Sequence, residues 1–310
     1  MEEQQGLQKP YDFDFEGFQT IDEAINEADK YVETARKGDR IVFSTKWKRL
    51  DRQLMGGLQP GKMYTIAGRP GSGKSQFSNQ LLFNVLDEAQ RIGKQKLIVF
   101  YWSFEMPGYQ QLLRIVSGDL NTSVYDLIQV GQESEYKHIL NKFKKYPIYF
   151  CNIPQTLIYF KNKLNQFCLN NKNITVINLI DHTRLFQGGN KEEMQRISDV
   201  SKACMEAQSK YQSITILLSQ LNRNIESNER ANNQYQPMLS DVFGSDAVGQ
   251  DSHVVMMINR PFDMYNIMEN YCGEQPKGLM AVHIEKNREG ELGMIPFQTH
   301  YPSFKLTERD

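Results

Sequence analysis

The sequence predicts an α/β fold: a mainly parallel, twisted sheet with helices on both faces and closing antiparallel strands. Three observations indicate it. Continuous apolar, β-branched runs alternate with helical segments from about residue 40, which is typical of a parallel sheet covered on both faces. A glycine-rich loop lies between one such run and a helix. The last part of the chain holds strand-like runs in succession, which favours antiparallel pairing there.

The N-terminal region is expected to lie apart from the main domain. Residues 1–19 are polar without clear periodicity and are expected to form a flexible arm. Residues 20–38 have apolar residues at helical spacing, with Thr20 and Glu23 placed as a capping box. The apolar stripe is narrow, so this helix either packs on its own core or docks on a neighbouring subunit. Residues 39–310 then form the main domain.

The main domain is expected to alternate strands with helices. In chain order, strands are expected at 63–67, 96–104, 146–152, 174–181 and 213–219, and helices at 75–93, 107–118, 155–170 and 191–211. The closing strands are expected at 252–260, 277–286, 293–300 and 303–308.

Composition narrows the function classes. The formal net charge of −1 gives no global basic field, so any site for a polyanion must be local or built from several subunits. The cysteines lack metal-ligand spacing and are expected to be reduced thiols: Cys151, Cys168, Cys204 and Cys272. No apolar run approaches the ~18 residues of a membrane span, and the acidic start MEEQQ is no signal peptide. We expect a cytoplasmic protein without membrane contact.

The loop GRPGSGKS predicts a nucleoside triphosphate site, for ATP or another NTP. It fits the phosphate-loop pattern and comprises Gly68, Arg69, Pro70, Gly71, Ser72, Gly73, Lys74 and Ser75. The glycines let backbone N–H groups face the phosphates, and the following helix adds its N-terminal dipole. Lys74 is expected to reach the β- and γ-phosphates and Ser75 to bind Mg²⁺. The alternative is a chance match in a glycine-rich turn.

Three polar residues follow buried strands at the edge where a parallel sheet binds ligands. Asp181 ends ITVINLID and can hold Mg²⁺ through water, although alone it would more often be a turn or cap residue. Glu105 follows KLIVFYWSF and is either a general base for the attacking water or a solvated helix cap before Pro107. Gln220 follows SITILLS and either bonds the γ-phosphate or its water, or is a turn residue.

Two regions near the C-terminus are further candidates. The stretch 221–250 is polar and long for a compact domain, which favours function or disorder over mere connection. Lys286 and Arg288 lie in HIEKNREG, between two expected strands. A cation at such a place is usually just solvated. In a ring of subunits it can instead reach a neighbour's nucleotide as an arginine finger.

Taken together, these motifs resemble the motor domain of DnaB-type hexameric replicative helicases over about residues 40–306. The run STKWKRLDRQLMGGLQPGKMYTIAGRPGSGKS resembles the start of that domain. The strings SFEM, INLIDH, LSQLNR, the SD-x-x-GS…QDSHVVMMINRP block and EKNREG follow in the family's order. Each string is weak alone, but together, in order and in the right strand contexts, they are specific.

The resemblance implies a RecA-like motor: a homo-hexameric ring around single-stranded DNA that translocates 5′-to-3′ and unwinds duplex with ATP hydrolysis. Carried over by motif, the catalytic residues are Lys74, Glu105 as the base, Gln220 as the γ-phosphate sensor, and Lys286 with Arg288 acting in the adjacent subunit's site. Asp181 is then the acid beside Mg²⁺, and Arg69 is the family's usual residue at its loop position.

The chain departs from the family's pattern at its start. The helix at 20–38 resembles the linker helix that docks on the neighbouring motor and holds the ring. Only about 19 residues precede it, so the separate N-terminal domain is expected to be missing, as in phage, plasmid or mobile-element versions. Primase and a loader protein are candidate partners, in a bacterial cell or a phage-infected host.

A second departure concerns DNA contacts. Phe243 stands where the family has an arginine that contacts phosphate in a loop facing the channel. Losing that cation would weaken binding, whereas a phenylalanine can stack on a base or fold under the loop as packing. The other candidate channel contacts are Arg223, Arg230, Gly244 and Ser245, with Lys191 and Arg196 after the Asp181 strand.

Two other function classes remain open from the sequence. One is a RecA-like ATPase switch or loader that binds partners without unwinding DNA. The presence of Glu105 and Arg288 argues against a switch without turnover, while Phe243 and the near-neutral charge leave this class open. The other is a strand-exchange recombinase, but the GGLQPG entry and the KNR hairpin fit the helicase better.

Overall fold

The structure is a computed structural model that describes residues 19–93, 96–129, 133–181, 192–243, 245–300 and 302–310. The chain divides into two compact units, Met1–Ile41 and Val42–Asp310. Each unit has its own architecture and is treated by itself below.

In the first unit, helix α1 (Ile21–Arg36) begins at the capping box that its sequence predicts. The Thr20 hydroxyl oxygen accepts from the Glu23 backbone N–H at 3.3 Å, and the Glu23 carboxylate accepts from the Thr20 N–H at 2.8 Å. None of the α1 residues is buried, and its apolar stripe includes Ile21 and Ile25, which are 73% and 57% exposed. The helix therefore has an apolar face without a core of its own.

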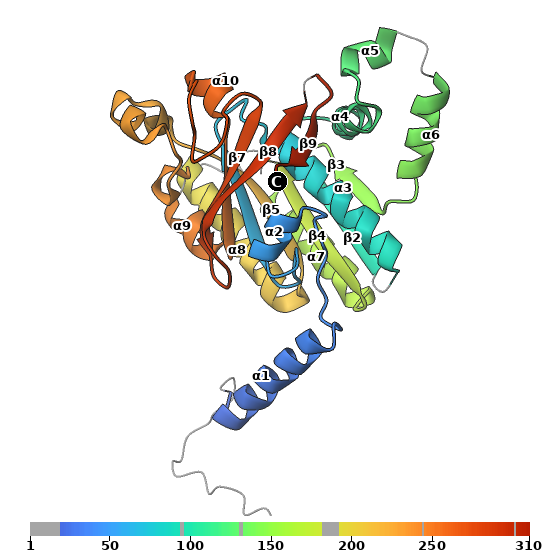
Figure 1. Cartoon of the computed structure of the whole chain (residues 1–310). Helices are drawn as coiled ribbons and strands as arrows, with labels where there is room; N and C mark the ends of the chain where they lie inside the picture. The colour runs from blue at the N-terminus through green and yellow to red at the C-terminus, as the bar shows by residue number, and fades with distance from the viewer. Residues whose placement is uncertain (1–18, 94–95, 130–132, 182–191, 244, 301) are drawn as a thin grey trace, which may run out of the picture. The chain divides into compact units, whose positions relative to one another are not determined.

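The second unit is built on a nine-stranded sheet with the strand order β3-β2-β4-β5-β1-β6-β7-β8-β9 (Figure 1). The strands are β1 (Met63–Gly68), β2 (Lys96–Ser103), β3 (Ile148–Cys151), β4 (Ile174–Asp181), β5 (Ile214–Gln220), β6 (Val254–Asn259), β7 (Leu279–Asn287), β8 (Gly293–His300) and β9 (Lys305–Glu308). The predicted α/β fold with a mainly parallel sheet is confirmed. One strand differs in detail: β6, expected among the closing strands, pairs parallel with β1, and antiparallel pairing begins at β7.

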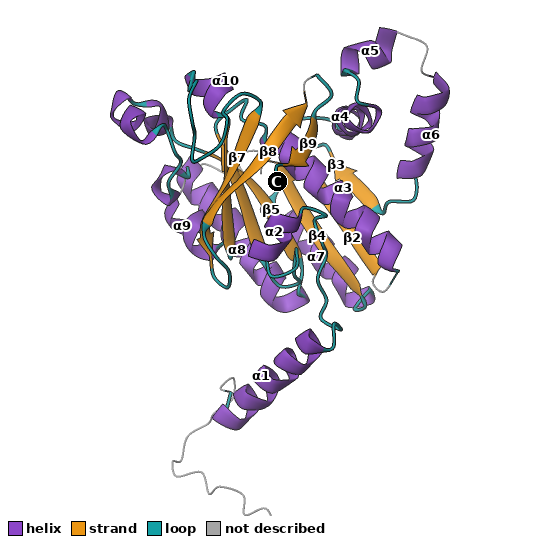
Figure 2. Cartoon of the chain, viewed as in Figure 1, coloured by secondary structure: helices purple, strands orange, loops and turns teal. Residues whose placement is uncertain are grey.

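Helices cover both faces of this sheet (Figure 2). They are α2 (Lys48–Gln53), α3 (Lys74–Ile92), α4 (Gly108–Leu120), α5 (Val124–Gln129), α6 (Glu133–Phe143), α7 (Leu157–Asn170), α8 (Glu193–Tyr211), α9 (Ser245–Asp251) and α10 (Pro261–Tyr265). The sequence reading gave no element to the region of α5 and α6. The stretch 221–250 is also more ordered than expected, since it holds three short 3₁₀ helices and α9.

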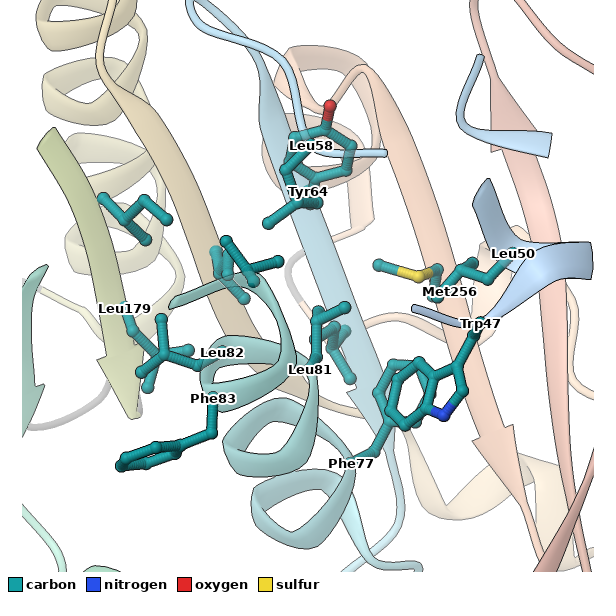
Figure 3. Close-up of a cluster of buried hydrophobic side chains, with 14 of the residues drawn as sticks. Trp47, Leu50, Leu58, Tyr64, Phe77, Leu81, Leu82, Phe83, Leu179 and Met256 are labelled. Carbon is teal, nitrogen blue, oxygen red and sulfur yellow. The ribbon is translucent and has the colours of Figure 1, made fainter. Parts of the chain in front are cut away.

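The period of two along each strand divides the core into two layers. On β1, Tyr64 and Ile66 enter the cluster around α3, whereas Met63 and Ala67 enter the cluster beneath α7 and α8. Figure 3 shows the layer around α3. There Trp47 stacks on Phe77, with ring centroids 5.1 Å apart, so the segment before β1 is anchored to the helix that the phosphate loop opens. Packing on both faces makes the central strands a rigid platform for the residues at their ends.

The carboxyl ends of β1, β2, β4 and β5 lie at the same edge of the sheet, because these strands are parallel and in register. Residues that follow these strands are therefore brought together there. Across the described residues, the helices lack the combination of length and apolarity that crossing a membrane requires.

Candidate nucleotide-binding site

The phosphate loop connects β1 to α3 in a conformation that depends on its glycines. At Gly68, a Cβ atom would stand 2.3 Å from the Ser72 hydroxyl oxygen, which no side chain could tolerate. Gly73, the N-cap of α3, has a φ of +96°, in the region that favours glycine. Helix α3 then begins at Lys74, and its first backbone N–H groups point into the loop. The loop has the form of an anion-binding cradle.

Lys74 is folded over the loop. Its ammonium donates to the carbonyl of Gly68 at 2.8 Å and to that of Arg69 at 3.1 Å. Burial lowers the pKa of Lys74 to about 8, while the nearby charges of Asp181 and Glu105 act to raise it. The loop thus holds a cation whose charge is poorly solvated, which favours binding of an anion beside it.

Ser75 and Asp181 form the oxygen pair expected of a magnesium site. The Ser75 hydroxyl donates to Asp181 Oδ2 at 3.2 Å, from the first turn of α3 to the end of β4. Burial raises the pKa of Asp181 to about 6, and the Glu105 charge adds to this, while the hydroxyl and the Lys74 charge oppose it. Hard oxygen donors and an under-compensated buried carboxylate fit Mg²⁺, whose charge would favour the ionised form.

Glu105 lies in the turn between β2 and α4 and is exposed. The N-cap of α4 is Pro107, so the alternative reading of Glu105 as the cap residue does not hold. Its carboxylate acts on the charges of both Lys74 and Asp181, which places it within electrostatic reach of the phosphate loop. The Phe104 N–H donates to the Asp181 backbone carbonyl at 3.2 Å and fixes this turn beside β4.

Gln220 ends β5 directly beside the phosphate loop. In the β1–β5 register it stands opposite Gly68, the first loop residue, and it is half-buried. Its backbone carbonyl accepts from the Phe243 N–H at 2.8 Å. Gln220 therefore joins the nucleotide edge of the sheet to the far end of the 221–250 stretch.

Arg69 makes a contact that its place in the loop motif did not reveal. Its Nε donates to the Glu226 carboxylate at 2.6 Å, and its Nη1 donates to the Leu221 carbonyl at 2.9 Å. Glu226 belongs to the first 3₁₀ helix after β5, Arg223–Glu226. The phosphate loop is thus tied to the start of the 221–250 stretch. The only sequence signal is an acidic residue in LSQLNRNIE, and it has no fixed spacing to Arg69.

Lys286 and Arg288 lie at the opposite end of the sheet from their own phosphate loop. Lys286 pairs with Val255 near the start of β6, and the Arg288 N–H donates to the His253 carbonyl just before that strand. The phosphate loop instead follows the last residue of β1. At about 3.3 Å per residue, the length of β1 separates the two places by roughly 17 Å. The structure does not bring these two cations together with the other site residues.

Both cations contact the last turn of α9. Lys286 Nζ donates to the Gly249 and Gln250 carbonyls at 2.6 and 2.9 Å, and Arg288 Nη2 donates to the Gln250 carbonyl at 2.7 Å. Cations are favourable at a helix C-terminus, where backbone carbonyls lack helical partners. Within one chain, the pair therefore fixes the end of the 221–250 stretch.

Several candidate DNA contacts have structural partners instead. Phe243 packs against the apolar cluster beneath α7 and α8, so the structure favours packing over the expected base stacking. Arg230 forms a two-point ion pair with the buried Asp241, at 3.1 and 2.9 Å, because folding of the stretch into 3₁₀ helices brings them together. Arg230 is therefore not available as the channel contact that was expected.

The remaining candidates divide into two groups. Arg223 is exposed at the start of the first 3₁₀ helix, and Arg196 is partly buried on α8. Ser245 is the first residue of α9. Gly244 and Lys191 lie outside the described residues.

Comparison with known proteins follows from this geometry. The family model of the DnaB-like helicase C terminal domain matches residues 43–306. The replicative DNA helicase DnaB of Mycoplasma pneumoniae is 25% identical over 306 residues, which cover 93% of this chain and 62% of the relative. This chain therefore spans about three fifths of the length of that relative.

Two solved structures share the fold. One, a helicase-type ATPase domain solved by itself, superimposes with a TM-score of 0.80 and 21% identity, covering 94% of this chain and all of that one. A DnaB-like replicative helicase, solved in a study of its interactions with primase, gives 0.77 and 22%, covering 94% and 68%. The resemblance drawn from the motifs and the RecA-like fold are both confirmed. The chain belongs to the DnaB-like helicase C-terminal domain family.

Proposed function

We propose that this chain is the motor of a replicative DNA helicase, in which hydrolysis of ATP drives a homo-hexameric ring along single-stranded DNA. One observation carries the proposal. Within a chain of this family, an anion cradle with a magnesium-type oxygen pair lies at one end of the sheet, and the Lys286–Arg288 pair lies at the other. A head-to-tail ring would bring these two ends together between subunits.

In this proposal the phosphate loop binds ATP, and Lys74 contacts the β- and γ-phosphates. Ser75 and Asp181 hold Mg²⁺, which supplies charge neutralisation at those phosphates. Glu105 accepts a proton from the attacking water, and its exposure at the mouth of the site leaves room for that water. Gln220 senses the γ-phosphate and passes its loss to the stretch that follows β5.

Lys286 and Arg288 would complete the site of the adjacent subunit, where Arg288 stabilises the charge that develops during phosphoryl transfer. Their position far from their own loop supports action across an interface. Residues 20–38 would dock on that neighbour as a linker helix. The exposed stripe of α1, which includes Ile21 and Ile25, is the kind of apolar face that such docking would cover.

Single-stranded DNA would pass through the centre of the ring, with 5′-to-3′ polarity as the family resemblance implies. Arg223 is the best-supported contact among the described candidates, because it is exposed close after Gln220. Primase and a loader are the proposed protein partners. A DnaB-like structural neighbour that was studied with primase supports the first of these.

Measurement of ATP hydrolysis with and without single-stranded DNA, together with unwinding of a forked duplex, tests the proposal. DNA-stimulated hydrolysis accompanied by strand separation is the expected result. Hydrolysis that ignores DNA, with no unwinding, would favour the second candidate, a RecA-like ATPase switch or loader. The contacts made by Phe243 and Arg230, which remove two expected DNA contacts, are the observation that favours this candidate.

A further inference from the structure

A series of buried polar side chains links the phosphate-loop helix α3 to the turn that carries Glu105. It consists of Asn79 on α3, Tyr101 and Ser103 on β2, and Gln111 on α4, each at most 2% exposed. None of the sequence motifs pointed to these residues, and none of them has a role in the mechanism proposed above. We refer to them as the α3–β2–α4 network.

The hydrogen bonds of this network run in one direction. The Tyr101 hydroxyl donates to Asn79 Oδ1 at 2.8 Å, and Asn79 Nδ2 donates to Gln111 Oε1 at 2.7 Å. Gln111 Nε2 donates to the Ser103 hydroxyl at 3.4 Å, and that hydroxyl donates to the backbone carbonyl of Met106. Each donor thus meets an acceptor, as buried polar groups require.

Both residues that flank Glu105 are held by this arrangement. The Met106 carbonyl accepts the last hydrogen bond of the network. On the other side, the Phe104 N–H donates to the Asp181 carbonyl at 3.2 Å. The Glu105 carboxylate itself is exposed, so its position is set mainly by these two backbone anchors.

The other end of the network lies close to the phosphate loop. Asn79 comes four residues after Ser75, so the two side chains lie on the same face of α3, one turn apart. The helix that carries the proposed Mg²⁺-binding hydroxyl therefore also anchors the network. A shift of α3 on nucleotide binding would be passed through Asn79 and Gln111 to the Glu105 turn.

Stability alone does not account for four polar side chains at this place. Apolar side chains of the same size would pack there without needing partners, whereas polar ones are costly unless each is bonded. What hydrogen bonds add is geometry. A displacement of about 1 Å in a reacting group can lower a rate by about 100-fold.

We propose that Gln111 and Asn79 are positioning residues that hold the Glu105 turn at a fixed place relative to the phosphate loop. This inference rests on the proposed function, in which Glu105 is the base for ATP hydrolysis. Neither residue contacts the nucleotide. Both act through the backbone that carries Glu105.

The test uses Gln111→Met, which keeps the side-chain volume and removes the hydrogen bonds. With ATP, Mg²⁺ and single-stranded DNA, kcat should fall about 10- to 100-fold, while the Kd for ATP stays within about 3-fold. In a Glu105→Gln background, Gln111→Met should cause no further loss, because the base it positions is already absent. Ser117→Ala is the matched control, since Ser117 is also buried on α4 but donates to the Thr122 carbonyl.

A wild-type kcat in Gln111→Met, an equal loss in Ser117→Ala, or a full further loss in the Glu105→Gln background would each overturn the inference. If Gln111→Met does not fold, Tyr101→Phe removes one hydroxyl of the same network and should lower kcat about 3- to 10-fold. A wild-type Tyr101→Phe would then count against it. A wild-type protein without DNA-stimulated hydrolysis would overturn the proposed function itself. Loss in Glu105→Gln without loss in Gln111→Met would overturn only this inference.

Discussion

Arg69 and Glu226 form an ion pair of 2.6 Å that joins the phosphate loop to the first 3₁₀ helix after β5. The guanidinium is mostly buried, at 13% exposed, and also donates to the Leu221 carbonyl, while the carboxylate is 42% exposed. The two residues belong to the segments that would hold nucleotide and face DNA. Their contact is therefore a physical route by which one site can bias the other.

Breaking this pair should weaken the coupling between DNA and hydrolysis more than hydrolysis itself. In Glu226→Ala, basal ATPase activity should stay within about 2-fold, while stimulation by single-stranded DNA falls about 5-fold or more. ATPase titrations with DNA measure both quantities. Because the carboxylate is partly exposed, raising the salt concentration in the wild type should reduce stimulation in the same direction.

Glu229→Ala provides the control for this prediction. Glu229 is exposed on the next 3₁₀ helix and carries the same charge. Its removal should leave DNA stimulation unchanged. Equal losses in the two variants would mean that general charge, and not the contact with Arg69, sets the coupling.

Asp181 should destabilise the Mg²⁺-free protein at neutral pH. Its folded pKa, raised to about 6 by burial and by Glu105, exceeds the unfolded value of about 3.9, so the folded state binds the extra proton between these values. The contribution to the free energy of unfolding is therefore lost as pH rises from about 4 to about 6, by on the order of 3 kcal/mol. Asp181→Asn should raise Tm at pH 7.5 without Mg²⁺, and show no gain near pH 4.

The same substitution should have the opposite effect once Mg²⁺ and ATP are present. The amide introduced by Asp181→Asn would lack the charge that attracts the cation, so the stabilisation that ligand binding gives the wild type should be largely absent. Thermal melts at two pH values, each with and without Mg²⁺–ATP, provide the comparison. A variant that is less stable than the wild type in Mg²⁺-free buffer at pH 7.5 would contradict the assigned strain.

Arg288→Ala should nearly abolish turnover while ATP affinity stays within a few-fold. An arginine supplied from a neighbour typically contributes about 10³- to 10⁵-fold to phosphoryl transfer. Mixed with Lys74→Ala chains, it should recover some activity, because a ring then contains sites with an intact loop from one chain and an intact arginine from the next. Arg91→Ala, which changes an exposed arginine paired with Glu88, serves as the control. No recovery at any mixing ratio would argue against action between subunits.

Short-range patterns predicted the nucleotide edge well. Asp181 and Gln220 end apolar strands, and a parallel sheet brings such ends together whatever the loops do. Contacts between distant segments could not be read in the same way. Glu226 is 157 residues from Arg69, and Asn79 and Gln111 sit inside helices whose periodicity says only that they face the core. Arg230 was misjudged because its partner depends on how the 221–250 stretch folds.

Arg230 and Arg223 should therefore differ sharply when each is replaced. Arg230 is 15% exposed and its partner Asp241 is 5% exposed, so Arg230→Ala leaves a buried carboxylate without its cation and should cost about 2–4 kcal/mol. Arg223→Ala should leave Tm within about 1 °C, since an exposed substitution of this kind costs little. If Arg223 contacts phosphate, its loss should reduce the salt dependence of DNA binding by about one unit per chain, whereas Arg230→Ala should leave that slope unchanged below its Tm. A lowered slope in Arg230→Ala, with stability intact, would restore Arg230 as a DNA contact and show that the ion pair opens when DNA binds.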